Sequence, residues 1–84
     1  MRVGLKLFAS LVDRLPPEAR PSHRVDLDVD EGSTVLDVIR RQGIPEVLCA
    51  IVLVDGVWVD KRDRATHPLL EGQVLAIWPP VAGG

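Results

Sequence analysis

Two consecutive prolines, Pro79 and Pro80, directly follow the last apolar segment and determine where a β-sheet in this chain can end. Neither residue has a backbone N–H, so neither can donate a hydrogen bond to a neighbouring strand, and both favour an extended course. We therefore expect a folded domain over residues 1–78 and a flexible tail over residues 79–84. The tail ends in Gly83 and Gly84, which have no side chains, so the α-carboxylate of Gly84 is the chemical group that it would present.

Five segments have the hydrophobic patterns of β-strands, and they are residues 3–7, 25–29, 50–54, 57–59 and 74–78. The first two alternate apolar and polar residues, which is typical of strands with one buried face. The third is continuously apolar and rich in β-branched residues, which predicts a strand buried on both faces. Asp55-Gly56 separates the third strand from the fourth and is typical of a two-residue hairpin turn.

The main helix is predicted between the second and third strands. Thr34 is placed to cap its first turn, and Asp37 three residues later completes a pattern that resembles a capping box. Gly43 is well placed to take the left-handed conformation that ends a helix. The apolar residues spaced to form its buried face are Val35, Val38 and Ile39.

The remaining segments complete the expected architecture. One or two helical turns are predicted over residues 9–15 and a loop over residues 17–23. The charged segment 60–64 is predicted to be exposed, whereas Leu69 and Leu70 are predicted to return to the core. Strands and helices mixed in this order indicate an α+β domain of two layers, with the main helix covering one face of the sheet.

Composition argues against several classes of function. The 84 residues suffice for one small domain, and a net charge of −2 offers no electrostatic reason to bind nucleic acid or an anionic membrane. One Phe, two Trp and no Tyr are too few for a base-stacking platform. The sequence shows neither a signal-peptide pattern nor a run near the ~20 apolar residues of a membrane span, so we expect a cytoplasmic protein.

Individual reactive residues suggest no catalytic or metal site. Cys49 is the single cysteine and lies in an apolar run, which predicts a buried, inert thiol and excludes an internal disulfide. His67 is expected in a surface loop without a partner. The carboxylates that alternate along the second strand are expected to face water rather than a metal ion, because neighbouring outward residues on a strand are ~7 Å apart. We therefore expect no bound metal or cofactor.

Several short motifs together resemble a known family, namely Glu31-Gly32-Ser33-Thr34-Val35, Val54-Asp55-Gly56, Leu70-Glu71-Gly72 and Pro79-Pro80-Val81-Ala82-Gly83-Gly84. The chain resembles the ubiquitin-like sulfur carriers of the MoaD/ThiS family, and among these most of all the small subunits of molybdopterin synthase. The resemblance covers nearly the whole chain, and the ending is its most specific part. It implies a β-grasp fold, in which a mixed sheet of about five strands wraps one main helix and the first and last strands lie side by side.

The resemblance also implies a function in which the chain is not catalytic alone. An activating enzyme similar to the first enzyme of ubiquitin conjugation would adenylate the Gly84 carboxylate with ATP. Sulfur from a donor such as a sulfurtransferase would then replace AMP and give a thiocarboxylate. The loaded tail would enter the large subunit of molybdopterin synthase and supply sulfur for the dithiolene of molybdopterin.

Contact with these partners is expected along the end of the chain, at Trp78, Pro79, Pro80, Val81 and Ala82, with Gly83 and Gly84 in the reacting position. Trp58 or Trp78 is predicted to supply an apolar anchor on the exposed faces of the last strands, because Trp is favoured at interface centres. The other tryptophan is expected to lie in the core. Trp78 stands where Phe is expected in the family.

Other functions remain open at the level of sequence. A close alternative is a sulfur carrier for thiamine or for thiolated tRNA, although Pro-Pro before Val-Ala-Gly-Gly favours molybdopterin. A protein modifier would use the same activated Gly84 to form an isopeptide bond with a lysine. A binding module with an inert tail is a third class.

Overall fold

The computed structural model describes residues 1–81, and their order of elements agrees largely with the sequence patterns. The strands are β1 (Arg2–Leu7), β2 (Arg24–Asp28), β3 (Ile51–Val54), β4 (Val57–Trp58) and β5 (Val74–Trp78). The α-helix is α1 (Val35–Arg41), and the short 3-10 helices are η1 (Ala9–Arg14), η2 (Pro17–Ser22), η3 (Glu46–Leu48) and η4 (Lys61–Asp63).

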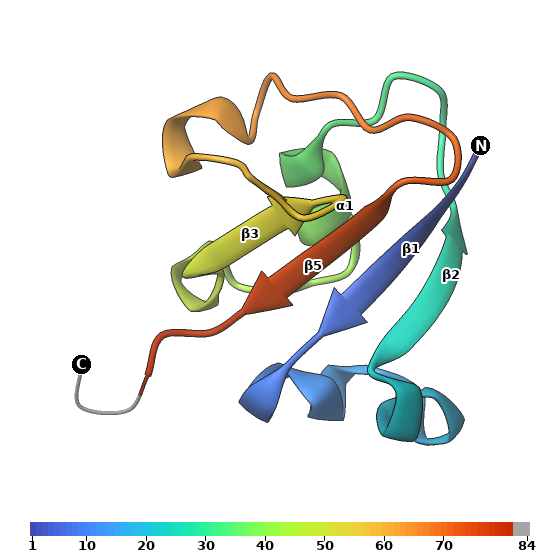
Figure 1. Cartoon of the computed structure of the whole chain (residues 1–84), viewed down its shortest axis with the longest axis vertical. Coiled ribbons are helices and arrows are strands. Elements are labelled where there is room, and N and C mark those ends of the chain that lie inside the picture. The colour runs from blue at the N-terminus through green and yellow to red at the C-terminus, as the bar shows by residue number, and fades with distance from the viewer. Residues whose placement is uncertain (82–84) are drawn as a thin grey trace.

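The strands form one mixed sheet in the order β2-β1-β5-β3-β4. β1 and β5 lie side by side and parallel at its centre, with Leu5 opposite Leu75, and the other neighbouring strands are antiparallel. Figure 1 shows both central strands pointing toward the same end of the sheet, where the chain continues past β5. The predicted α+β architecture, with the first and last strands adjacent, is therefore confirmed.

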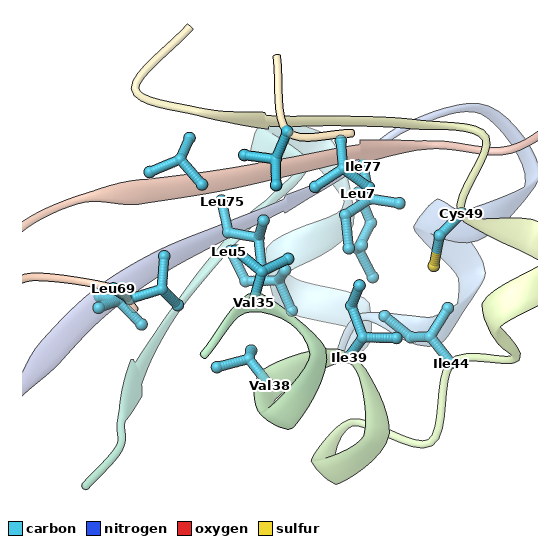
Figure 2. Packing of buried hydrophobic residues seen from close by; sticks show 14 of the residues in the cluster. Leu5, Leu7, Val35, Val38, Ile39, Ile44, Cys49, Leu69, Leu75 and Ile77 are labelled. Carbon is cyan, nitrogen blue, oxygen red and sulfur yellow. The ribbon is translucent and has the colours of Figure 1, made fainter. Parts of the chain in front are cut away.

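The core lies between α1 and one face of the sheet. Thr34 caps the helix as predicted, because its side chain accepts the N–H of Asp37 while the Asp37 carboxylate accepts the N–H of Thr34. Figure 2 shows the two layers meeting through Leu5, Leu7, Leu75 and Ile77 from the sheet and Val35, Val38 and Ile39 from the helix. All of these side chains are buried, so the alternation in β1 and the helical spacing in α1 identified them correctly.

Local turn signals were also correct. Asp55 and Gly56 both have positive φ, 48° and 81°, as the predicted two-residue hairpin turn requires, and Val54 pairs with Val57 across it. The Asp55 carboxylate accepts the N–H of Val74 at 2.8 Å, which ties the hairpin to β5. Gly43, with φ of 70°, follows the end of α1 as expected.

Two predictions about secondary structure and burial were wrong. β3 is buried on one face rather than two, since Val52 and Val54 are buried while Ile51 is 41% exposed. The physical reason is that α1 covers one face of the sheet and leaves the other open. Residues 17–22 form the 3-10 helix η2 instead of a loop, with Ala19 N–H donating to the carbonyl of Pro16.

Two side chains between β4 and β5 also differ from the predicted burial. Arg64 is buried rather than exposed, and its Nη1 donates to the carbonyl of Cys49 at 2.7 Å. Its Nε is buried and has no hydrogen-bond partner within the described residues. Leu70 is 62% exposed, whereas Leu69 enters the core, and the Leu70 N–H donates to the side chain of Gln73. Predictions of burial from charge and hydrophobicity alone were therefore wrong for both side chains.

The adjacent leucines provide a matched test of the core. Leu69→Ala removes a side chain that is 1% exposed and is expected to lower the free energy of unfolding by about 2–5 kcal/mol. Leu70→Ala makes the same chemical change at an exposed side chain and is expected to stay within about 0.5 kcal/mol of the original. Urea denaturation of both variants measures the difference, and equal losses would contradict the assignment of Leu69 to the core.

The capping box predicts a pH dependence of stability. The pKa of Asp37 is lowered from 3.8, chiefly because its carboxylate accepts the backbone N–H of Thr34. The ionised carboxylate therefore stabilises the fold above the unfolded-state pKa, and this contribution is lost as the pH falls through the folded-state pKa. We expect Asp37→Asn to be less stable than the original at neutral pH and the difference to shrink on acidification. Urea midpoints across pH measure it, with Asp13→Asn, an exposed carboxylate outside the box, as the control; a pH-independent difference would contradict this account.

Candidate functional site

The candidate site begins where β5 ends. The carbonyl of Trp78 accepts the N–H of Ala50 at 3.0 Å, and the sheet does not continue through Pro79 and Pro80. Pro79 is half-buried, Pro80 is exposed and Val81 is 77% exposed, so the chain moves away from the domain surface over these residues. The predicted end of the sheet is confirmed.

The predicted reacting residues are outside this description. Ala82, Gly83 and Gly84 lie outside the described residues, and their roles remain predictions. The described part of the site extends to Val81 and consists of the elements that hold and surround the end of β5.

Three aromatic rings are stacked at the end of β5. The Phe8 and Trp78 rings have centroids 4.2 Å apart and lie 4° from parallel, and the His23 ring stacks on Phe8 at 5.3 Å and 20°. The Phe8 N–H donates to the carbonyl of Ile77, which brings the two strand ends together. His23 was not identified from the sequence. The sequence places His23 directly before β2, but its contact with Phe8 depends on the order of the strands in the sheet.

The sheet face opposite α1 carries an apolar surface beside these rings. The outer apolar patch is defined here as Ile51, Leu53, Trp58, Ala76 and Trp78. Its members are cross-strand neighbours, since Ile51 pairs with Trp78 and Leu53 pairs with both Ala76 and Trp58. Ile51 is 41% and Trp58 55% exposed. The patch is continuous with the point where the chain leaves the sheet.

The prediction that one tryptophan lies in the core was wrong. Trp58 is exposed and Trp78 is half-buried, and both belong to the outer apolar patch. The reason is the strand register, which places Trp58 opposite Leu53 and Trp78 opposite Ile51, all on the face that α1 does not cover. The expectation of an exposed tryptophan on the last strands is therefore met by Trp58 and not by Trp78.

Reactive side chains elsewhere do not form a catalytic arrangement within residues 1–81. Cys49 is buried as predicted, with Sγ 3.7 Å from the carbonyl oxygen of Pro45. Burial raises the pKa of its thiol, an effect that the nearby Arg64 only partly opposes. His67 is half-buried rather than on the open surface, and its carbonyl accepts the N–H of Val35.

Residues 1–81 contain no cluster of His, Cys, Asp or Glu suited to a metal ion. The exposed carboxylates of β2 pair with arginines instead, Asp26 with Arg24 at 3.0 Å and Asp28 with Arg2 at 3.9 Å. None of the helices within residues 1–81 has the length and apolar character needed to cross a membrane. What the described residues offer is an exposed apolar surface and a chain that leaves the sheet beside it.

Comparison with known families finds one family model that matches most of the chain. A family model described as the ThiS family matches residues 5–84. No curated protein matches the chain.

Solved structures share the whole architecture. The solution structure of the Haloferax volcanii HVO 2177 protein is 28% identical with a TM-score of 0.73, covering 100% of this chain and 87% of that one. SAMP1 from Haloferax volcanii is 26% identical with a TM-score of 0.68, covering both chains completely. The complex of subunits 1 and 2 of the molybdopterin-converting factor from Helicobacter pylori contains a chain that is 20% identical with a TM-score of 0.59, also with complete coverage of both, and at that identity it supports the fold alone. The predicted β-grasp fold is confirmed by these likenesses.

The buried thiol gives a test of the site assignment. Because Cys49 is 4% exposed and its pKa is raised by burial, we expect the native protein to react with a disulfide reagent at pH 8 at least about tenfold more slowly than the urea-unfolded chain. Absorbance of the released thiolate measures both rates. Equal rates would contradict an inert Cys49 and would return it to consideration as a nucleophile.

Proposed function

The chain belongs to the ThiS family, and from this we propose that it is a sulfur carrier whose reacting group is the α-carboxylate of Gly84. We further propose that it serves as the small subunit of a molybdopterin synthase. The match to the family extends through residue 84 and therefore includes the Gly83-Gly84 pair. That match is the observation that carries the proposal.

The chemistry of a carboxylate explains why such a carrier needs an activating partner. A carboxylate is a poor electrophile because its negative charge repels a nucleophile. In the proposed scheme the Gly84 carboxylate attacks the α-phosphorus of ATP and pyrophosphate leaves. The acyl group of the resulting adenylate no longer carries the carboxylate charge and has AMP as a good leaving group. A sulfur nucleophile at the oxidation level of sulfide, supplied by a donor such as a sulfurtransferase, then displaces AMP and leaves a thiocarboxylate.

The active sites for these steps would belong to other proteins. An E1-like adenylating enzyme would bind ATP, and the carrier would place its end among the reacting atoms, where proximity supplies much of the rate. Gly83 and Gly84 suit this role because a chain without Cβ atoms can enter a narrow channel. ATP-dependent activation of this kind is consistent with the expected cytoplasmic location.

The described residues support docking beside the tail. The outer apolar patch provides the exposed Trp58 and the half-buried Trp78 next to the point where the chain leaves the sheet. Buried tryptophans are common energetic centres of interfaces. We propose that this patch and residues 78–82 contact the activating enzyme and then the large synthase subunit, so that one docking mode serves both partners in turn.

The choice of pathway rests on the sequence of the tail. Pro79-Pro80 before Val-Ala-Gly-Gly favours the synthase role. In that role the thiocarboxylate supplies sulfur for the dithiolene of molybdopterin. A carrier for thiamine or tRNA thiolation would use the same first steps with a different acceptor.

A second candidate function is protein modification. The likeness to SAMP1 from Haloferax volcanii favours it independently of the synthase role, and a solved structure of the H. volcanii small archaeal modifier protein 1 is also similar in fold. The same acyl adenylate would then pass to a lysine amine and form an isopeptide bond.

Intact mass of the protein isolated from its native host tests the proposal. A thiocarboxylate is expected to add about 16 Da to the free chain, because sulfur replaces one oxygen. Gly84→Ala is expected to reduce this loaded fraction strongly while the melting temperature stays unchanged, since residue 84 is predicted to belong to the tail and not to the folded domain. Leu70→Ala, a change at an exposed residue of the domain, is the matched control and should load normally.

Three outcomes would contradict parts of this proposal. Normal loading of Gly84→Ala would remove the tail from the mechanism. Conjugates of higher mass without a loaded free chain would favour the modifier. Capture of an acceptor from the thiamine or tRNA pathways by the loaded chain would replace the synthase role.

A further inference from the structure

We propose that the stacked rings of Trp78, Phe8 and His23 hold the end of β5 and so determine the direction in which the chain leaves the sheet. Phe8 and His23 are then positioning residues that act through Trp78. This inference rests on the proposed function in one respect, because the chain that leaves the sheet is the part proposed to react. Its structural content is independent of which partner receives that chain.

The three rings come from the ends of three neighbouring strands. Phe8 follows the last residue of β1, Trp78 is the last residue of β5, and His23 precedes β2. Because β1 lies between β2 and β5 in the sheet, the Phe8 ring is placed between the other two. The rings are close to parallel, so they form a continuous stack across three strands.

The stack lies at the point where the β-ladder hydrogen bonds of β5 end. The Trp78 carbonyl accepts the Ala50 N–H on the β3 side, but Pro79 and Pro80 have no N–H with which to extend the ladder. Strand ends without further ladder bonds open easily. On the β1 side, the Phe8 ring fixes the Trp78 side chain and ties the last residue of β5 to its neighbour.

The backbone on the β1 and β2 side adopts unfavourable conformations around this stack. Ala9, directly after Phe8, has a φ of 51°, and His23 itself has a φ of 61°. Both values lie in the left-handed region that non-glycine residues disfavour. The His23 ring is held there by its stack on Phe8 and by the contact of Nδ1 with the Leu7 carbonyl oxygen at 3.2 Å. Such conformations persist where the surrounding contacts over-determine them.

The two prolines keep the chain after Trp78 in the direction that Trp78 sets. Each proline ring restricts φ to a narrow range, so Pro79 and Pro80 follow an extended course set by the residue before them. A fixed Trp78 therefore gives the chain a preferred direction at least to Val81. For a carboxylate that must meet reacting atoms in another protein, this order lowers the conformational entropy lost on docking.

The matched variants remove one ring at a time. Phe8→Leu keeps an apolar side chain but removes the central ring, and His23→Asn removes the outer ring with a residue that tolerates positive φ. Trp78→Phe keeps a ring at the end of β5 and is the conservative variant. Trp58→Phe changes the outer apolar patch outside the stack and serves as the control. Thermal melting shows which variants remain folded.

NMR relaxation and residual dipolar couplings of the Val81 amide provide the readout. We expect a lower order parameter and a changed coupling at Val81 in Phe8→Leu, a smaller change of the same sign in His23→Asn, and values near the original in Trp78→Phe and Trp58→Phe. Unchanged Val81 values in Phe8→Leu and His23→Asn would overturn the inference, whether or not the protein carries sulfur.

Adenylation kinetics with the native host's E1-like enzyme then connect this order to function. Phe8→Leu is expected to raise the KM for the carrier by about two- to tenfold, the range expected when one immobilised side chain is released, with kcat unchanged. An unchanged KM beside a lower Val81 order parameter would overturn the positioning role. Failure of the original protein to be adenylated would instead overturn the proposed function and leave the Val81 result standing.

Discussion

The parallel pairing of β1 with β5 is the contact on which the rest of the structure depends. It joins the two ends of the folded domain, aligns Leu5 with Leu75 over α1, and leaves β2 and β3 to add on either side. Parallel strands need a long connection, and here almost the whole chain provides it. Because the pairing is central, the end of β5 is supported by neighbours on both sides, and the chain leaves from a fixed point rather than from an edge.

A single helix makes the two faces of the sheet chemically different. α1 has seven residues and covers one face, where side chains such as Val52 and Ile77 are fully buried. The other face has no second layer in the described residues, yet β3, β4 and β5 place apolar side chains there, including Trp58. An open apolar face on a small domain is typical of an interaction surface. Because α1 covers only one face of the sheet, the core is small and the opposite apolar face is left open.

The proposed function separates a stable domain from a reacting end, so it requires no catalytic group within the domain. A carrier that visits several partners needs a fold that stays unchanged and an end that each partner can enter. Trp78 lies at the boundary between these two parts, since its carbonyl belongs to the sheet and the next two residues cannot join it. Under the proposed function, the aromatic stack at this boundary would orient the residues that react.

Local patterns in the sequence determined the secondary structure, the core and the end of the sheet. The capping box at Thr34, the turn at Asp55-Gly56 and the prolines after Trp78 act over a few residues, so they could be read directly. The family resemblance added that the first and last strands are neighbours. Tertiary structure alone decided that Arg64 is buried, that Leu70 is exposed, that both tryptophans face outward, and that His23 joins Phe8 and Trp78. Each of these depends on which strands become neighbours and which face the helix covers, and those contacts join residues that lie far apart in the chain.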